Sequence, residues 1–229
     1  LAAANSPTAV DGIVSGQAQV GETAGRVIDR IGGEWVQSSY SLRPVRTENG
    51  AAFGGTQYIQ FAGAAPGGEA GLIGVNFEPA SLPTGGDSMG LITGHNFVGE
   101  SPGLVLLDVS GAAKLAVRAV DELLTTYLVR GSTTIEAGVE YNVVLRSDGT
   151  AGGIYLNGQP ETLTVVTGSN AGLWFGPLGA VTVYLGANFG GFTLFDGTIR
   201  RAAFTTQLTS VGSALQLNRF LKSGRRMMA

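Results

Sequence analysis

The stretch Glu140–Gly158, EYNVVLRSDGTAGGIYLNG, decides the fold that the sequence predicts. From Tyr141 to Arg146, successive side chains alternate in character with the period of a β-strand. Residues 147–150, Ser-Asp-Gly-Thr, supply a turn, residues 154–156 supply a second strand, and Asn-Gly at 157–158 turns the chain again. The stretch therefore predicts an antiparallel hairpin. It holds no cluster of acids, bases or thiols that would indicate a function.

The composition fits a turn-rich β protein. The chain has 229 residues, of which 44% are hydrophobic, so a sizeable core can form in one large β domain or in two small ones. Glycine accounts for 37 residues and charged side chains for only 14%. A sandwich with many tight turns would explain both values, because hairpin turns often need a residue with positive φ.

Charge and cysteine content exclude several kinds of partner and site. The net charge of −3 provides no field that would attract nucleic acid or an anionic membrane. No cysteine is present, which excludes disulfides, thiolate metal sites and thiol nucleophiles. No run of 18 apolar residues could span a membrane.

Apolar runs recur along the chain at short, regular intervals. They predict strands at residues 57–61, 71–77, 89–93, 103–109, 114–120, 125–129, 163–166, 181–186 and 198–204. So many short strands favour two stacked antiparallel sheets. The spacing of apolar residues predicts one short helix over 209–221, with Thr209 or Ser210 as its N-cap.

Three parts of the chain differ in composition and in the periodicity of their apolar residues. Residues 1–25 are small and polar without a sustained period, and we expect a linker or an N-terminal arm. Residues 26–222 form the predicted domain. Residues 223–229 are expected to be a basic, solvated tail.

Four segments together carry a family resemblance: residues 27–33 with Ser-Leu-Arg-Pro at 41–44, residues 53–59, residues 141–158, and residues 185–199 with Phe204 and Leu-Thr-Ser at 208–210. In sequence and in order along the chain, they resemble the concanavalin A-like jelly roll, in particular its laminin-G-like branch. The resemblance implies an all-β, two-sheet antiparallel jelly-roll sandwich with a short C-terminal helix. It also implies either carbohydrate or protein binding without chemistry, or cleavage of glycans, in a secreted bacterial protein or a phage appendage.

The residues give little support to catalysis. A retaining glycosidase needs two carboxylates about 5 to 5.5 Å apart, a spacing that suits positions i and i+2 of one strand. No predicted strand carries such a pair, because Asp121 and Glu122 are adjacent and Glu136 and Glu140 lie at a turn. A lyase site could form only around His95, the single histidine. We therefore predict that the chain is not an enzyme.

Candidate ligand contacts lie in three segments that resemble loops. Exposed aromatic rings could stack on sugars there, with amide or imidazole groups bonding the hydroxyls. The candidates are His95, Asn96, Trp174, Phe175, Asn188 and Phe189. Two alternatives stay open: His95 as a surface residue without a role, and Trp174 or Phe175 as a plug at the end of the core.

No metal site is predicted, although calcium stays open as a cofactor. Members of the family often bind Ca²⁺ through Asp, Asn and backbone carbonyls. The residues Asp87, Asp108, Asp148 and Asp196 are isolated in the sequence. Two of them precede glycine, where a capped turn is the simpler explanation.

The sequence and the family resemblance leave three hypotheses for the function. The leading one is a non-catalytic recognition module that binds surface carbohydrate, extracellular or on a virion. The alternative is a structural virion protein, in capsid decoration or a tail, that contacts neighbouring proteins in a larger assembly or homo-oligomer. A glycan-cleaving hydrolase or lyase comes third, since its residues are missing.

Overall fold

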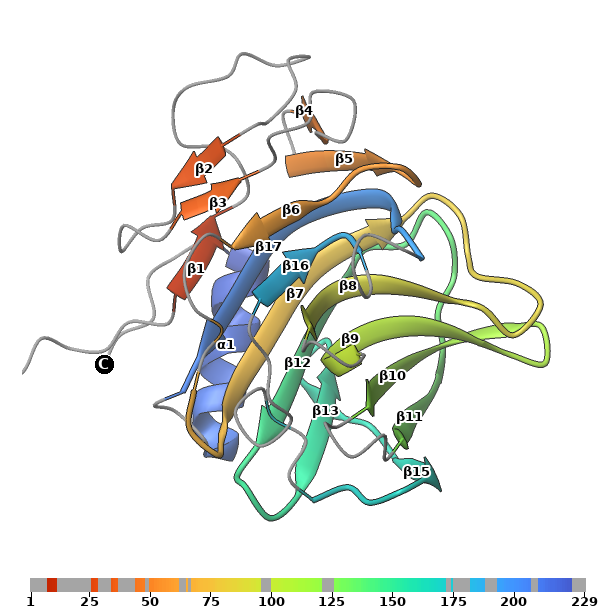
Figure 1. Ribbon diagram of the computed structural model, residues 1–229, viewed down its shortest axis with the longest axis vertical. Coiled ribbons are helices and arrows are strands. Elements are labelled where there is room, and N and C mark those ends of the chain that lie inside the picture. The colour runs from red at the N-terminus through yellow and green to blue at the C-terminus, as the bar shows by residue number, and fades with distance from the viewer. Residues whose placement is uncertain are drawn as a thin grey trace, which may run out of the picture.

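Two antiparallel sheets lie face to face, and a single helix packs against the outside of one of them (Figure 1). The computed structural model describes residues 8–11, 26–28, 34–36, 44–47, 50–61, 65, 67–95, 100–120, 126–171, 174, 182–187, 193–206 and 210–223. Within these residues the all-β sandwich with a short C-terminal helix is confirmed.

The eight-stranded sheet has the order β14-β13-β12-β7-β17-β5-β4, and β1 pairs with β17. Its strands are β1 (Thr8–Asp11), β4 (Val45–Thr47), β5 (Gly50–Gly54), β7 (Gly71–Pro79), β12 (Tyr141–Ser147), β13 (Gly152–Leu156), β14 (Gln159–Pro160) and β17 (Asp196–Thr205). The predicted hairpin is confirmed as β12 and β13, which pair from Val143 with Leu156 to Ser147 with Gly152.

Strand β1 lies within residues 1–25, which were predicted to be a linker or an N-terminal arm. Its residues Thr8–Asp11 pair with residues 201–204 of β17. On the same edge of β17, strand β5 pairs only with residues 196–199. The backbone groups of the following residues of β17 therefore need another partner, which β1 supplies. Part of the expected arm therefore extends the sheet.

The nine-stranded sheet has the order β15-β11-β10-β9-β8-β16-β6-β3-β2. Its strands are β2 (Arg26–Ile28), β3 (Glu34–Val36), β6 (Ile59–Phe61), β8 (Ser88–His95), β9 (Glu100–Val109), β10 (Ala112–Val120), β11 (Thr126–Thr134), β15 (Thr164–Thr167) and β16 (Thr182–Leu185). Strand β16 pairs with both β8 and β6, which brings three distant parts of the sequence side by side.

The core fills the space between the two sheets. Alternate residues of the central strands face it, as Val75 and Phe77 do in β7 and as Leu115 and Val117 do in β10. The Phe77 ring stacks on that of Tyr141, with centroids 5.7 Å apart, so aromatic contacts join neighbouring strands inside the core.

Helix α1 (Val211–Ser223) covers the outer face of the eight-stranded sheet. The Ser210 hydroxyl accepts a hydrogen bond of 3.0 Å from the Ser213 amide, which confirms Ser210 as an N-cap. A Cβ at Gly74 would lie 2.7 Å from a methyl carbon of Leu221, so the missing side chain lets the helix approach the sheet closely. Among the described residues, no helix is long and apolar enough to cross a membrane.

Candidate functional site

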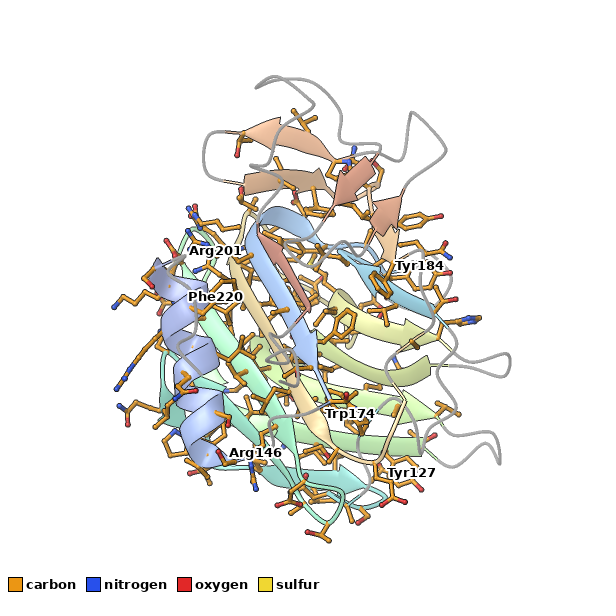
Figure 2. All side chains as sticks on the ribbon, turned by 90° about the vertical axis from the view of Figure 1, so that its left-hand side faces the viewer. Tyr127, Arg146, Trp174, Tyr184, Arg201 and Phe220 are labelled. Carbon is orange, nitrogen blue, oxygen red and sulfur yellow. The ribbon has the colours of Figure 1, made fainter. Side chains whose placement is uncertain are left out.

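The outer face of the nine-stranded sheet lies on the opposite side of the sandwich from α1. In β16, Val183 and Leu185 are buried in the core, so Thr182 and Tyr184 point to the outer face. Figure 2 shows Tyr184 on this side, away from the helix. This placement makes Tyr184 available for contacts outside the core.

Two further aromatic rings contact Tyr184. The ring of Tyr58, just before β6, lies 5.7 Å from it at an interplanar angle of 70°. The ring of His95, the last residue of β8, lies 6.3 Å away at 74°. All three residues are half-buried, so part of each remains accessible to solvent. We call Tyr58, His95 and Tyr184 the aromatic patch.

Polar side chains flank the aromatic patch. Gln60 pairs with Tyr184 across the sheet and Thr182 pairs with His95, and both are half-buried. Paired residues of antiparallel strands share a face, so an amide and a hydroxyl stand beside the rings. The patch thus combines apolar ring surface with hydrogen-bonding groups.

The chain also returns to this face just after β16. Thr93, which pairs with Tyr184, donates a hydrogen bond of 2.8 Å from its hydroxyl to the Ala187 carbonyl. Ala187 immediately precedes Asn188 in the sequence. Asn188 and Phe189, two of the candidate ligand contacts, therefore come directly after a residue at this face in the sequence. Both lie outside the described residues.

Burial in the aromatic patch disfavours the charged forms of His95 and Tyr184. Burial lowers the pKa of His95 below its ordinary 6.5. Burial, with a smaller contribution from Tyr58, raises the pKa of Tyr184 above 10.0. A neutral imidazole and a neutral phenol can each donate and accept a hydrogen bond, as a sugar hydroxyl does.

The structure corrects the predicted environment of His95. His95 was predicted to lie in a loop after residues 89–93, whereas it lies on β8 and pairs with Glu100 on one side and Thr182 on the other. Because strands flank it on both sides, its backbone is held in the sheet. The role of His95 as a ligand contact stays a prediction.

The structure also corrects Trp174, which was a candidate for stacking on sugars. Its side chain is 0% exposed and belongs to the core between the sheets (Figure 2). The indole Nε1 donates to the Gly67 carbonyl at 3.4 Å, and a Cβ at Gly71 would overlap the ring. The alternative prediction, that this side chain closes the end of the core, is therefore correct for Trp174. Asn96 and Phe175 lie outside the described residues, and their roles stay predictions.

Two of the isolated aspartates, Asp108 and Asp148, stabilise turns through hydrogen bonds to backbone amides. The carboxylate of Asp108 accepts hydrogen bonds from the amides of Gly86, at 2.8 Å, and Gly111, at 2.9 Å. One oxygen of Asp148 accepts from the backbone amides of Thr150 and Ala151, at 2.9 and 2.7 Å. Hydrogen bonds from Thr150 and Ala151 hold the pKa of Asp148 well below its usual range. Within the described part of the chain, no group of three or more metal-ligating side chains occurs.

A second polar cluster lies on the outer face of the eight-stranded sheet. Arg200, at a register shift in β17, lies 2.7 Å from a carboxylate oxygen of Glu78 and 3.5 Å from one of Glu140. The buried Asn76 amide donates to Glu140 at 2.7 Å. No local pattern indicates this carboxylate pair, because Glu78 and Glu140 lie far apart in the sequence. A hydrolase would need these acids free to protonate and attack a glycosidic bond, whereas Arg200 engages both, which favours a structural role.

Comparisons with known proteins support the architecture only at the level of fold. No known family matches the sequence, and no curated protein matches it. Domain 4 of AbnA, an extracellular GH43 arabinanase from Geobacillus stearothermophilus solved with arabinotriose, superimposes with a TM-score of 0.54 at 14% identity, covering 93% of this chain and 87% of that one.

Two other solved structures are similar. The CBM40 of the Ruminococcus gnavus IT-sialidase, bound to α2,3-sialyllactose, gives a TM-score of 0.50 at 15% identity and covers 66% of this chain and 84% of that one. The receptor-binding domain of botulinum neurotoxin type G gives 0.62 at 9% identity, over 95% of this chain and 51% of that one. At such identities the likeness establishes the fold, a two-sheet antiparallel jelly-roll sandwich.

Proposed function

We propose that this chain is a non-catalytic recognition module that binds carbohydrate at the aromatic patch. The observation that carries the proposal is the meeting of three half-buried aromatic residues, Tyr58, His95 and Tyr184, on the face opposite α1. Aromatic rings offer apolar surface to the C–H faces of sugars, and their polar ends can bond the hydroxyls. His95 and Tyr184 lie on strands that are paired on both sides, so their backbones are already ordered before a ligand binds.

The fold comparisons are consistent with this proposal. Two similar structures, the arabinanase domain and the CBM40, were solved with an oligosaccharide bound. The resemblance noted in the sequence suggests a setting outside the cell, on a secreted bacterial protein or a virion appendage. In that setting the ligand would be a surface glycan, and calcium would be an accessory ion to be tested.

A glycan array with the purified chain, run with and without Ca²⁺, tests the proposal. Tyr184→Ala is the test variant, and Tyr127→Ala is the control, because it removes another half-buried tyrosine from the same sheet. We expect Tyr184→Ala to lose binding and Tyr127→Ala to keep it. If no glycan binds in either condition, or if both variants bind as the wild type does, the proposal is wrong.

Contact with neighbouring proteins is the second candidate, and one observation favours it. Strand β15 lies at the end of its sheet, and its Val165 and Val166 are 47% and 48% exposed. Exposed apolar edge strands are sites of association. Light scattering would compare Val165→Lys with Val211→Lys, which changes a valine that is 49% exposed on α1. A larger species that only Val165→Lys dissociates would support this function, and a monomeric wild type would refute it for self-association.

A further inference from the structure

Strand β15 forms an open edge of the nine-stranded sheet. It stands at the end of the strand order and pairs only with β11 among the described strands. All four of its residues, Thr164–Thr167, are exposed, and Val165 and Val166 are 47% and 48% exposed. The backbone groups that point away from β11 therefore have no strand partner among the described residues, and two apolar side chains lie beside them.

The neighbouring part of the same sheet edge is already closed. Strand β15 pairs with residues 128–130 of β11, so the end of β11 extends beyond it. There the Glu161 carboxylate accepts hydrogen bonds from the Thr133 amide, at 2.9 Å, and from the Thr133 hydroxyl, at 2.6 Å. A Cβ at Gly131 would lie 2.7 Å from the same carboxylate, so this acid rests directly against the backbone of β11. A side chain covers the edge where β15 does not, which confines an added strand to Thr164–Thr167.

The other edge strands contain residues that discourage pairing with another chain. Strand β14, at one end of the eight-stranded sheet, contains the exposed Pro160, which has no amide hydrogen to donate. Each of the others has a charged residue in its sequence: Arg46 in β4, Asp11 in β1 and Arg26 in β2. Prolines and charges are the usual means of keeping an edge unpaired. The sequence of β15, Thr-Val-Val-Thr, has neither.

This sequence suits pairing with a second copy of itself. In a two-fold contact a residue on the axis meets its own counterpart, so a charge there would face a like charge. Valine and threonine avoid that repulsion, and two facing valines remove apolar surface from water on both sides. Arg130, which pairs with Thr164, lies one strand further in. Its two copies would be three strand spacings apart, about 14 Å, where salt screens their repulsion.

A β-bulge limits the strength of such a contact. Between the pairs Leu128–Thr167 and Val129–Val165, the extra residue Val166 has no partner on β11. A bulge bends its strand, so the ladder that forms on the open edge should be short. The four residues of β15 are also far fewer than the roughly 20–30 residues that each partner gives to a standard interface. We therefore expect a dimer that dissociates on dilution.

We propose that two copies of this chain associate edge to edge through β15, antiparallel, about a two-fold axis close to Val165 and Val166. The two nine-stranded sheets then continue into one another with their outer faces on the same side, so the dimer presents both aromatic patches on one surface. Strand β16 is five strand positions from β15, which leaves roughly 50 Å of sheet between the patches. The inference deepens the second function proposed above, because it names the partner and the arrangement.

Sedimentation equilibrium of the purified chain over a wide concentration range measures the association. We expect the wild type to change from monomer to dimer as the concentration rises. Val165→Lys places two like charges beside the axis, and it should raise the dissociation constant at least about tenfold. Val139→Lys is the control, because it changes a valine that is 39% exposed between β11 and β12, and it should dimerise as the wild type does.

Single cysteines locate the contact, because the chain has no cysteine of its own. Val165→Cys and Val166→Cys are oxidised separately, with Val139→Cys as the control. We expect a covalent dimer from at least one of the β15 variants and none from the control, since the axis sets a residue of β15 opposite its counterpart, within reach of a disulfide.

Two outcomes would overturn the inference. A dimer that Val165→Lys does not weaken, and that neither β15 cysteine joins, would do so while leaving self-association through another surface standing. A wild type that stays monomeric at every concentration would overturn both the inference and self-association. Neither outcome affects the proposal of sugar binding, because the glycan array tests it separately.

Discussion

Replacing Trp174 by alanine should destabilise the fold and leave sugar affinity unchanged. The indole is 0% exposed, and it rests against the backbone of Gly71, where even a Cβ would overlap it. Removing a fully buried tryptophan costs about 3–5 kcal/mol, since the surroundings close only partly over the cavity. The hydrogen bond to Gly67 adds little to this cost, because its length of 3.4 Å exceeds the usual range. For a chain of this size, the melting temperature should fall by roughly 6–20 °C.

Urea unfolding followed by far-UV circular dichroism would measure the loss from Trp174→Ala. Fluorescence is less suitable, because the chain has only two tryptophans. Trp174→Phe serves as the control and should lose less, since a ring still fills most of the space. An unchanged unfolding midpoint in Trp174→Ala would refute the burial argument. So would a fully folded variant that no longer binds a sugar bound by the wild type.

Gly71→Ala should cost about 1–3 kcal/mol by the same unfolding assay, because the added carbon would meet the Thr205 carbonyl as well as the indole. Ser210→Ala removes the N-cap of α1 and should cost about 0.5–2 kcal/mol in calorimetry, and an equal midpoint would contradict that role. Asp148 has a lowered pKa in the fold, so stability should fall as the pH drops below 3.8, where the unfolded chain takes up the proton. Asp148→Ala should lose this dependence in acid titrations. His95 also has a lowered pKa, so stability should decline below pH 6.5, and this component should vanish in His95→Gln.

Local sequence predicted the hairpin and the helix because the pattern that indicates each of them lies within its own residues. The alternation from Tyr141 to Ser147 and the turn at Asp148 lie within one continuous stretch, and the structure keeps them together as β12 and β13. The pairing of Thr8–Asp11 with β17 was missed, since it depends on an edge that β5 leaves open nearly 200 residues later in the chain. Such a contact has no signal in either segment alone.

The aromatic patch escaped prediction for a related reason. Tyr58 and Tyr184 look ordinary in the sequence, and they meet the candidate His95 only because β16 lies between β8 and β6. For Trp174 the error is the opposite one, because a residue predicted to contact a ligand is buried in the core. Its flanking glycines and proline indicate a turn, but they do not determine which way the ring points. The absence of a side chain at Gly71, over a hundred residues earlier, leaves the space that the ring fills. On this fold, the register of the strands decides whether an aromatic residue faces the core or the outer surface, where a ligand could bind. Candidate binding residues are therefore those that alternate with core positions along a strand, as Tyr184 does with Val183 and Leu185.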